Sequence, residues 1–481
     1  MYRNEYDAIV VGSGPNGLSA AITMQQQGLS VLLLEGRDSI GGGLRSAELT
    51  LPGFMHDVCS AIHPMALTSP FLKTLPLEQF GLSYIHPAAD AAHPFDDGTA
   101  AVLYSSLEKT AQLLGEDCVT YERLYAPLLK DFPELMAEVL GPLKVPKHPL
   151  VMARFGLKAL PSALQLARRF KGKAARGLFG GIAAHSIQPL SNAATAAVGL
   201  VLSLNSHASG WPVPRGGAQS LANALADHFI YLGGEIQTNT YVKTLSELPP
   251  SRAVLLDVTP KQLLSIAGER FTSFYKWQLQ RYRYGMGVFK VDWALEAPVP
   301  FTAAGCREAG TVHLGNTIEE IAASELQTSR GQHPEKPFVL LAQQSVFDNS
   351  RAPKGKHTAW AYCHVPNGST KDMTAAIEDQ VERFAPGFKD LILGRHVMNT
   401  AEMESYNPNY IGGDINGGVI DISQLYTRPA IRLSPYSTPA KGIYICSSST
   451  PPGGGVHGMC GYYAARKALK DVFGLRIFLS N

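Results

Sequence analysis

The segment from residue 7 to residue 35 constrains the fold more than any other part of the chain. An apolar run at Asp7–Val11 leads into Gly12-Ser13-Gly14-Pro15-Asn16-Gly17, and a stretch of helical character follows over residues 18–27. A second apolar run at Val31–Leu34 ends at Glu35. A strand, a glycine-rich turn, a helix, a strand and an acid in this order are typical of a βαβ unit that binds a dinucleotide. We therefore predict an α/β fold built on a Rossmann-type parallel sheet.

Each residue type in this motif has a physical reason. Gly12 permits a tight turn, Gly14 lets a pyrophosphate approach the backbone, and Gly17 lets the helix pack on the strand. The helix N-terminus, with Ser13 and Asn16 beside it, offers N–H groups and a positive dipole end to phosphates. Glu35 can accept hydrogen bonds from ribose hydroxyls.

Composition and charge exclude several classes of protein. A 481-residue chain that is 45% hydrophobic can bury a large core, which excludes a disordered or fibrous protein. The 42 basic and 40 acidic residues leave a net charge of +2, which argues against a nucleic-acid binder. The six cysteines form neither a CxxC pair nor a metal-ligand spacing, so we expect no disulfide framework and no metal. We also expect a cytoplasmic protein, because the N-terminus does not resemble a signal peptide.

Charge is unevenly distributed along the chain. No carboxylate occurs between Glu138 and Asp227, whereas lysines and arginines are frequent over residues 144–176. The most apolar part, residues 193–204, is shorter than the ~20 residues that a membrane span needs, so we predict a buried helix there. The basic helical segment Pro161–Phe170, with Arg168, Arg169, Lys171 and Lys173, has two interpretations: a solvated or subunit-docking face, or peripheral contact with an anionic membrane.

The residues after Glu35 resemble those of a known superfamily. Gly41-Gly42 follows the acid at a spacing of six, and Gly43 and Arg45 come next. This pattern resembles the flavoprotein amine oxidase superfamily, in particular phytoene desaturase-like oxidoreductases such as the group named pyridine nucleotide-disulfide oxidoreductase domain-containing protein 2. The resemblance implies FAD as cofactor, with contacts from Gly36, Arg37, Gly42, Gly43 and Arg45. Many members carry arginine directly after the glycine pair, where this chain has Gly43.

Two later segments extend the resemblance. Gly442–Cys446 reads as a strand, and a loop rich in glycine and proline then leads to a helix from Gly461. In the superfamily such a loop delivers a helix N-terminus beneath the flavin, which implies cofactor contacts at Gly454, Gly455 and Val456. The segment 214–242 reads as a helix and then a strand through Val242, and the matching residue in the superfamily holds the adenine through its backbone.

The resemblance implies a discontinuous architecture. We expect a Rossmann-type FAD-binding domain from residues 1–70, 205–270 and 435–481. An interleaved α+β substrate domain would comprise 71–204 and 271–434, with a basic, largely helical insert at 105–200. Strands near 286–294, 311–314, 338–343 and 358–364 would form its mixed sheet.

Three residues are candidates for catalysis: Lys290, His63 and His457. Lys290 lies where amine oxidases of the superfamily carry a lysine that holds a water at the flavin, although a surface lysine on an alternating strand explains it equally well. His63, Ser60 and His457 are expected to line the reaction cavity, where a histidine could serve as a general base. Cys59 and Cys446 lie outside any covalent-attachment motif, so we predict non-covalent FAD.

The resemblance implies an enzyme that abstracts a hydride from a C–H bond of an apolar or cyclic small molecule to form a double bond. O₂ or a quinone would accept the electrons. One alternative is a flavin amine oxidase, which Lys290 favours. Another is a non-enzymatic prenyl- or lipid-binding escort of the GDP-dissociation-inhibitor type, against which the intact Glu35 and Gly41-Gly42 argue. The sequence does not predict the oligomeric state.

Overall fold

The computed structural model describes residues 5–479 and contains a five-stranded parallel sheet drawn from three separate parts of the chain. The predicted βαβ unit supplies β1 (Tyr6–Val11) and β2 (Val31–Leu34). The strand order is β16-β10-β1-β2-β9, and all neighbours pair in parallel. The other three strands are β9 (Glu235–Gln237) and β16 (Ile443–Ile445), which form the two edges, and β10 (Ser251–Leu256), which lies between β16 and β1. The predicted Rossmann-type sheet is confirmed.

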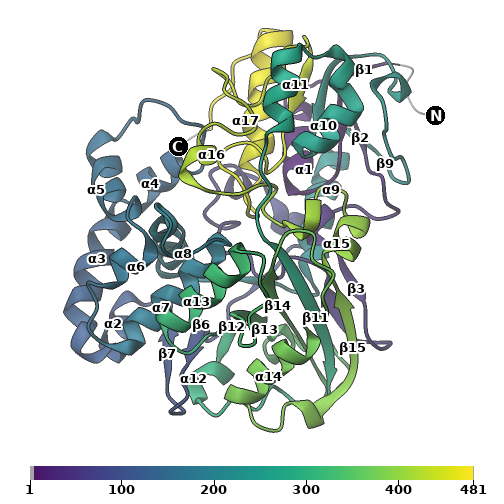
Figure 1. The fold of residues 1–481 in the computed structure, drawn as a ribbon. Helices are drawn as coiled ribbons and strands as arrows, with labels where there is room; N and C mark the ends of the chain where they lie inside the picture. Colours follow the sequence, from purple (N-terminus) through teal and green to yellow (C-terminus); the bar gives the residue numbers. More distant parts are fainter. Residues whose placement is uncertain (1–4, 480–481) are drawn as a thin grey trace.

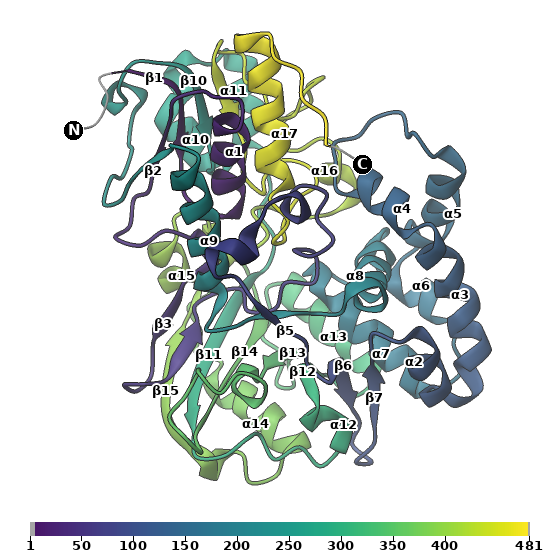
Figure 2. The same ribbon diagram turned by 180° about the vertical axis from the view of Figure 1, so that it is seen from behind.

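Both faces of this sheet are covered, as the apolar character of its strands requires. Helices α1 (Pro15–Gln25), α9 (Ala218–Tyr231) and α17 (Met459–Ala468) pack on one face. Helices α10 (Pro260–Ala267) and α11 (Ser273–Gln280) pack on the other. Helices α1 and α17 lie side by side (Figure 2), so close that a Cβ on Gly461 would lie 1.8 Å from the Asn16 carbonyl oxygen. This contact joins the N-terminal motif to the C-terminal helix.

A second, seven-stranded mixed sheet lies below the first in Figure 1. Its order is β15-β11-β14-β13-β12-β6-β7, and only the β12–β6 pair is parallel. The four predicted strands are present as β11 (Gly287–Leu295), β12 (Ala309–Leu314), β13 (Val339–Ala342) and β14 (His357–Val365). Three further strands were not predicted: β6 (Ala89–Pro94), β7 (Ala100–Leu103) and β15 (Ile392–Met398). Helices α12 (Ala304–Arg307), α13 (Ile318–Ser329), α14 (Thr374–Phe384) and α15 (Thr400–Tyr406) accompany this sheet.

The predicted helical insert forms a lobe at the side of the molecule (Figure 1). Its helices are α2 (Leu107–Leu113), α3 (Cys118–Lys130), α4 (Phe132–Val139), α5 (Pro149–Ala159), α6 (Ala163–Ala167), α7 (Lys173–Ala183) and α8 (Thr195–Ser209). Helix α8 is the predicted buried helix, and its neighbours α5, α6 and α7 cover it. Among residues 5–479, no helix combines the length and the apolar character needed to cross a membrane.

Candidate functional site

A cavity of about 1070 Å³ runs from the carboxyl ends of the parallel strands to the helical insert. Of the residues predicted to hold a cofactor, all except Gly17 line it: Gly12, Ser13, Gly14, Asn16, Glu35, Gly36, Arg37, Gly42, Gly43, Arg45, Val242, Gly454, Gly455 and Val456. Gly17 instead packs against the turn, because a Cβ there would lie 1.9 Å from the Gly12 carbonyl oxygen. The structure thus brings three distant segments to one wall.

Backbone groups without side chains form the centre of this wall. Gly42 adopts a φ of 56°, and a Cβ on it would lie 3.0 Å from the Gly14 Cα. A Cβ on Gly14 would in turn lie 3.0 Å from Asp257 Oδ2. The two glycine backbones are therefore in direct contact, and a side chain at either position would crowd its neighbours and narrow this part of the cavity wall.

The Glu35 carboxylate is buried at the end of β2 and fully engaged. Oε2 accepts hydrogen bonds from the backbone N–H and hydroxyl of Ser13, and Oε1 accepts one from the Arg37 N–H at 2.9 Å. The Arg45 guanidinium forms an ion pair with Oε1 at 3.0 Å. Arg45, two positions after the usual arginine, thus holds the Glu35 carboxylate at the end of β2.

Sequence reasoning missed Asp257, the residue that follows β10. Its side chain is partly buried, and Oδ2 accepts a hydrogen bond from the Gly17 N–H at 2.9 Å. Burial raises the pKa of Asp257 to about 7, and the negative charge of Glu35 contributes to the shift. An acid at the carboxyl end of a strand beside β1 was the available signal, since ligands of such sheets bind there.

Val242 lies in a loop and not on a strand, contrary to prediction. Strand β9 ends at Gln237, and the chain then turns at Asn239, whose φ is 54°. The N–H groups of Asn239 and Thr240 donate to the carbonyls of Arg37 and Glu35, so backbone pairing with the turn after β2 replaces a longer strand.

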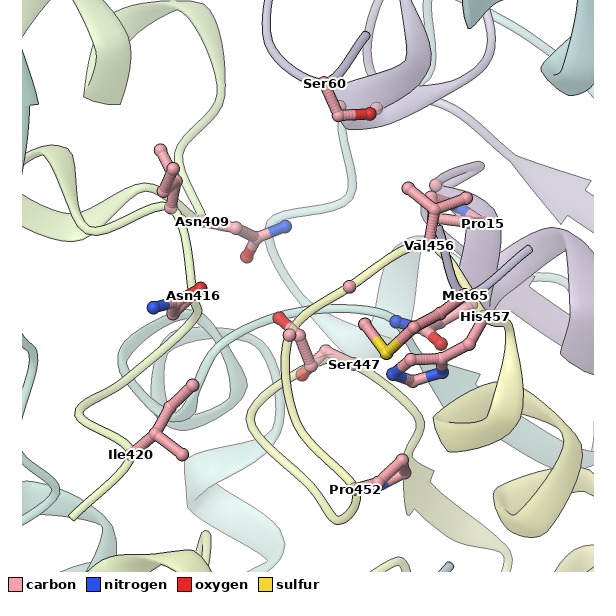
Figure 3. Close-up of a pocket in the computed structure, with 18 of the residues that line it drawn as sticks. Pro15, Ser60, Met65, Asn409, Asn416, Ile420, Ser447, Pro452, Val456 and His457 are labelled. Atoms are coloured by element: carbon pink, nitrogen blue, oxygen red, sulfur yellow. The ribbon is translucent and has the colours of Figure 1, made fainter. Parts of the chain in front are cut away.

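The C-terminal loop delivers the N-terminus of α17 to the same cavity. Gly458, with a φ of 68°, precedes the helix, and His457 Nδ1 accepts a hydrogen bond from the Met459 N–H at 3.0 Å. Burial lowers the pKa of His457 to about 4, so its ring is neutral at pH 7. Figure 3 shows Val456 and His457 close to Pro15 and Met65. His457 lines the cavity, but its Nδ1 is already occupied by the hydrogen bond from the first residue of α17.

His63 also lines the cavity, and it is paired with Ser60. Its Nε2 lies 2.9 Å from the Ser60 hydroxyl, and burial lowers its pKa to about 4. His63 Nδ1 is buried and has no hydrogen-bond partner among the described residues. Ser60, labelled in Figure 3, therefore presents the hydroxyl of this neutral pair to the cavity.

Lys290 is buried, so the interpretation as a surface lysine is wrong. Its Nζ forms an ion pair with Asp292, and it lies 5.3 Å from the centre of the Trp360 ring. Trp360 lines the cavity, whereas Lys290 does not. Asp292 Oδ2 lies 3.5 Å from His396 Nδ1, which links the pair to a half-buried ring on β15. Lys290 thus lies one side chain behind the wall.

The two cysteines considered for covalent attachment lie in different places. Cys59 lines the cavity, and its Sγ accepts a hydrogen bond from the Tyr410 hydroxyl at 3.3 Å. Burial raises the pKa of the Cys59 thiol, which disfavours the nucleophilic thiolate. Cys446 is fully buried on the sheet and does not line the cavity.

The half of the cavity beyond the parallel sheet is mostly apolar. The insert contributes aliphatic and aromatic side chains, among them Leu140, Met152, Phe155, Val198 and Val201, and the mixed sheet contributes Leu340, Trp360 and Tyr362. The acids that line the cavity are all engaged: Glu35 and Asp257 as described, and Glu138 through the Lys147 N–H and the Lys144 ammonium. Among the described residues, this half therefore offers no free carboxylate.

His185 is a polar exception that the sequence analysis missed. It lines the cavity, and its Nε2 lies 2.8 Å from Nε2 of the buried His313. Burial lowers the pKa of His185 to about 3, so both rings are neutral at physiological pH. No pattern in the sequence could have predicted the pair, because its members lie 128 positions apart. His185 lies in the short helical turn Ala184–Ser186 after α7, and His313 lies on β12.

Comparison with known proteins agrees with this geometry. The profile of the family described as "Flavin containing amine oxidoreductase" matches residues 16–264. The chain belongs to this family. It is therefore an FAD-dependent oxidoreductase, and the escort interpretation is set aside.

Two relatives and two solved structures align over nearly the whole chain. "Pyridine nucleotide-disulfide oxidoreductase domain-containing protein 2" of Mus musculus is 26% identical over 98% of this chain and 94% of its own. One of the subunits of limonene dehydrogenase from Castellaniella defragrans is 24% identical over 98% and 96%. An oxidoreductase from Methanosarcina mazei superposes with a TM-score of 0.64 at 14% identity over 96% and 99%, and putrescine oxidase bound to putrescine with 0.61 at 16% over 98% and 99%.

The residues of this family member fit the flavin dinucleotide. The contact between Gly14 and Gly42 leaves a cradle that a Cβ would fill, and Glu35 stands at the end of β2. The Asn16 Oδ1 at the N-terminus of α1 is buried and has no hydrogen-bond partner among residues 5–479. The glycine cradle suits a phosphate chain, whereas Glu35 and the Asn16 Oδ1, which accept hydrogen bonds, suit hydroxyl groups of the ligand.

Proposed function

We propose that this flavoenzyme removes a hydride from a C–H bond of an apolar or cyclic small molecule, leaving a double bond, and that it holds FAD without a covalent bond. One observation carries the proposal: the half of the cavity beyond the parallel sheet is apolar, and the acids that line it are already engaged. A protonated amine would lose its hydration there without gaining a counter-charge, whereas an apolar molecule would be stabilised. The relative from Castellaniella defragrans is named for limonene, a compound of the apolar class.

Different residues of the chain would bind the cofactor, stabilise negative charge, exclude water and accept a proton. FAD, when bound by Gly14, Gly42, Glu35 and their neighbours, supplies the hydride acceptor. The N-terminus of α17 places a positive dipole end at the loop that lines the cavity, which favours negative charge on a group bound there. The aliphatic side chains of the insert exclude water, and the Ser60–His63 pair offers a neutral acceptor for the proton that the substrate loses.

Amine oxidation is the second candidate, and one observation favours it. The Trp360 and Tyr362 rings stack 5.7 Å apart with an interplanar angle of 13°, and both line the cavity. Such a pair can hold a neutral amine through its ring faces. The electrons would pass to O₂ or to a quinone in either reaction.

Anaerobic bleaching of the flavin distinguishes the two candidates. The purified protein is mixed without oxygen with cyclic terpenes, cyclic ketones, carotenoids and primary amines, and flavin absorbance is followed. We expect bleaching by one of the apolar compounds and none by the amines. Bleaching by amines alone would establish the second candidate. Re-oxidation of the bleached flavin by air or by a quinone then identifies the electron acceptor. In a separate test, flavin that stays with the protein after acid precipitation would contradict non-covalent binding.

The cofactor assignment has a separate test at Gly14. Gly14→Val should displace the phosphate chain and raise the dissociation constant of FAD by tenfold or more, since about 1.4 kcal/mol suffices for that change. Glu35→Ala should act in the same direction. Gly268→Val is the control, because a Cβ there would meet only Leu264 Cδ2 at 3.9 Å. Equal flavin-to-protein ratios in the Gly14 and Gly268 variants would overturn the assignment.

A further inference from the structure

Large apolar side chains project into solvent around one end of the molecule. In the loop between α4 and α5, Leu143 is 71% exposed and Val145 is 91% exposed. On α5, Leu150 and Leu157 are 81% and 77% exposed. Single exposed apolar residues are ordinary, but a group of them on one helix and the loop before it indicates a contact surface.

This surface surrounds the outer end of the cavity. Leu143 and Pro146 of the loop line the cavity, as do Met152 and Leu160 on and just after α5. Facing residues come from the segment at α16 (Ile422–Leu425), where Ile422 and Tyr426 are themselves half exposed. Figure 1 shows α5, α4 and α16 on the same side of the molecule. Exposed apolar residues therefore stand at the part of the cavity assigned to an apolar substrate.

A basic hollow adjoins the same loop. It has a volume of about 400 Å³ and shares Pro142 and Lys144 with the main cavity. Its cations are Lys144, Arg466, Lys467, Lys470 and Arg476, and no acid of the described chain lines it. Lys144 and Lys467 have carboxylate partners, whereas Lys470 and Arg476 form no ion pair with any residue from 5 to 479. Phe478, 74% exposed, also lines the hollow, and the Arg466 guanidinium lies 5.0 Å from the centre of its ring.

We infer that this end of the molecule docks on an anionic phospholipid bilayer, with a lipid phosphate in the basic hollow and the apolar side chains of the loop and α5 in the interface. This inference rests on the proposed function, because it would let an apolar substrate pass from the acyl chains into the cavity without crossing water. Charge complementarity selects the occupant: unpaired cations beside exposed apolar residues fit an anionic surface. A second copy of the chain would fit poorly, since a two-fold contact sets the same cations against each other.

The docking surface differs from the one that the sequence suggested. In the segment 161–170, Leu166, Ala167 and Phe170 are buried in the insert and cannot meet a bilayer. Arg168 and Arg169 are exposed there without an accompanying apolar face. Helix α5 and the loop before it supply the apolar component instead.

Co-sedimentation of the flavin-loaded protein with vesicles tests the inference. Phosphatidylglycerol–phosphatidylcholine vesicles and pure phosphatidylcholine vesicles are compared at low and high salt. We expect binding to the anionic vesicles at low salt, a loss in high salt, and a roughly thirtyfold lower partition coefficient for Lys470→Ser/Arg476→Ser, because two cations are removed. The control is Lys336→Ser/Lys354→Ser, which removes two exposed lysines from the loops before β13 and β14.

The apolar component has its own variant and control. Leu143→Ser/Val145→Ser/Leu150→Ser should weaken binding to the anionic vesicles, whereas Leu113→Ser/Phe274→Ser, exposed on α2 and α11, should leave it unchanged. No binding at low salt, or equal losses in test and control variants, would overturn the inference. So would a dimer in sedimentation velocity that these same variants dissociate. Binding to vesicles does not depend on turnover, so the two proposals can fail separately. If the protein binds anionic vesicles but no apolar compound bleaches its flavin, the proposed function is refuted and the docking surface is not.

Discussion

At the scale of single residues, Asp257 should make the binding of FAD depend on pH. Its carboxyl lies 3.0 Å from the position of a Cβ on Gly14, where the phosphate chain is expected, and burial raises its pKa to about 7. As the pH rises through 7, Asp257 ionises and places a negative charge beside an anionic ligand. FAD affinity should therefore fall roughly tenfold between pH 6 and pH 8, the equivalent of one pKa unit.

Asp257→Asn should flatten this profile. Asparagine keeps an oxygen that can accept the hydrogen bond from the Gly17 N–H, but it does not ionise. Fluorescence titration of the apoprotein with FAD at several pH values measures the effect. His63 and His457 do not titrate in this range, because burial lowers the pKa of each to about 4. A slope that persists in the variant would show that the titrating group lies elsewhere.

At the scale of the element, β11 shows how a buried strand can hold a charge pair. All nine of its residues are buried between β14 and β15, and Lys290 and Asp292 satisfy each other on one face. Lys290→Met would leave the Asp292 carboxylate buried without its main partner, which costs about 3–5 kcal/mol of stability. Lys290→Met/Asp292→Leu should recover most of the loss, as measured by urea unfolding.

The same variants test a role for Lys290 in the reaction. If Lys290 acts on the flavin through a water, Lys290→Met should slow re-oxidation by O₂ more than reduction by substrate in stopped-flow traces. The double variant should then recover stability but not the re-oxidation rate. Recovery of both would assign the lysine to structure alone, and unchanged half-reactions in the single variant would contradict the role.

Elements with a local signature could be predicted from the sequence, and elements that depend on distant neighbours could not. The turn Gly12–Gly17 and the acid Glu35 lie within one βαβ unit, so spacing alone located them. Strand β6, with the sequence ADAAHP, carries no β-branched residue and exists because β12 and β7 pair with it. Lys290 and Asp292 alternate as on a solvent-facing strand, yet the chain around His56 covers that face, and the Trp360 ring of the neighbouring β14 lies against Lys290.

At the scale of the whole molecule, the cavity joins parts that are far apart in sequence. The parallel sheet supplies the cradle, the mixed sheet one wall of the remaining half, and the insert the other. Folding also removes several imidazole rings from water, three of them at the cavity (His63, His185 and His457) and the others elsewhere. Burial lowers the pKa of six of them to about 4 or below: His56, His63, His93, His185, His207 and His457.

These histidines predict a protein that loses stability in mild acid. In the unfolded chain each ring binds a proton near pH 6.5, whereas in the folded protein it stays neutral until about pH 4. The unfolded state therefore binds more protons between these limits, and the free energy of unfolding decreases as the pH is lowered, by at most about 1.4 kcal/mol per pH unit for each histidine. Urea unfolding in saturating FAD from pH 7.5 to pH 5 measures the slope. His63→Gln should make this slope less steep, because one fewer ring takes up a proton on unfolding. A free energy of unfolding that stays constant from pH 7 to pH 5 would contradict the neutral burial of these rings.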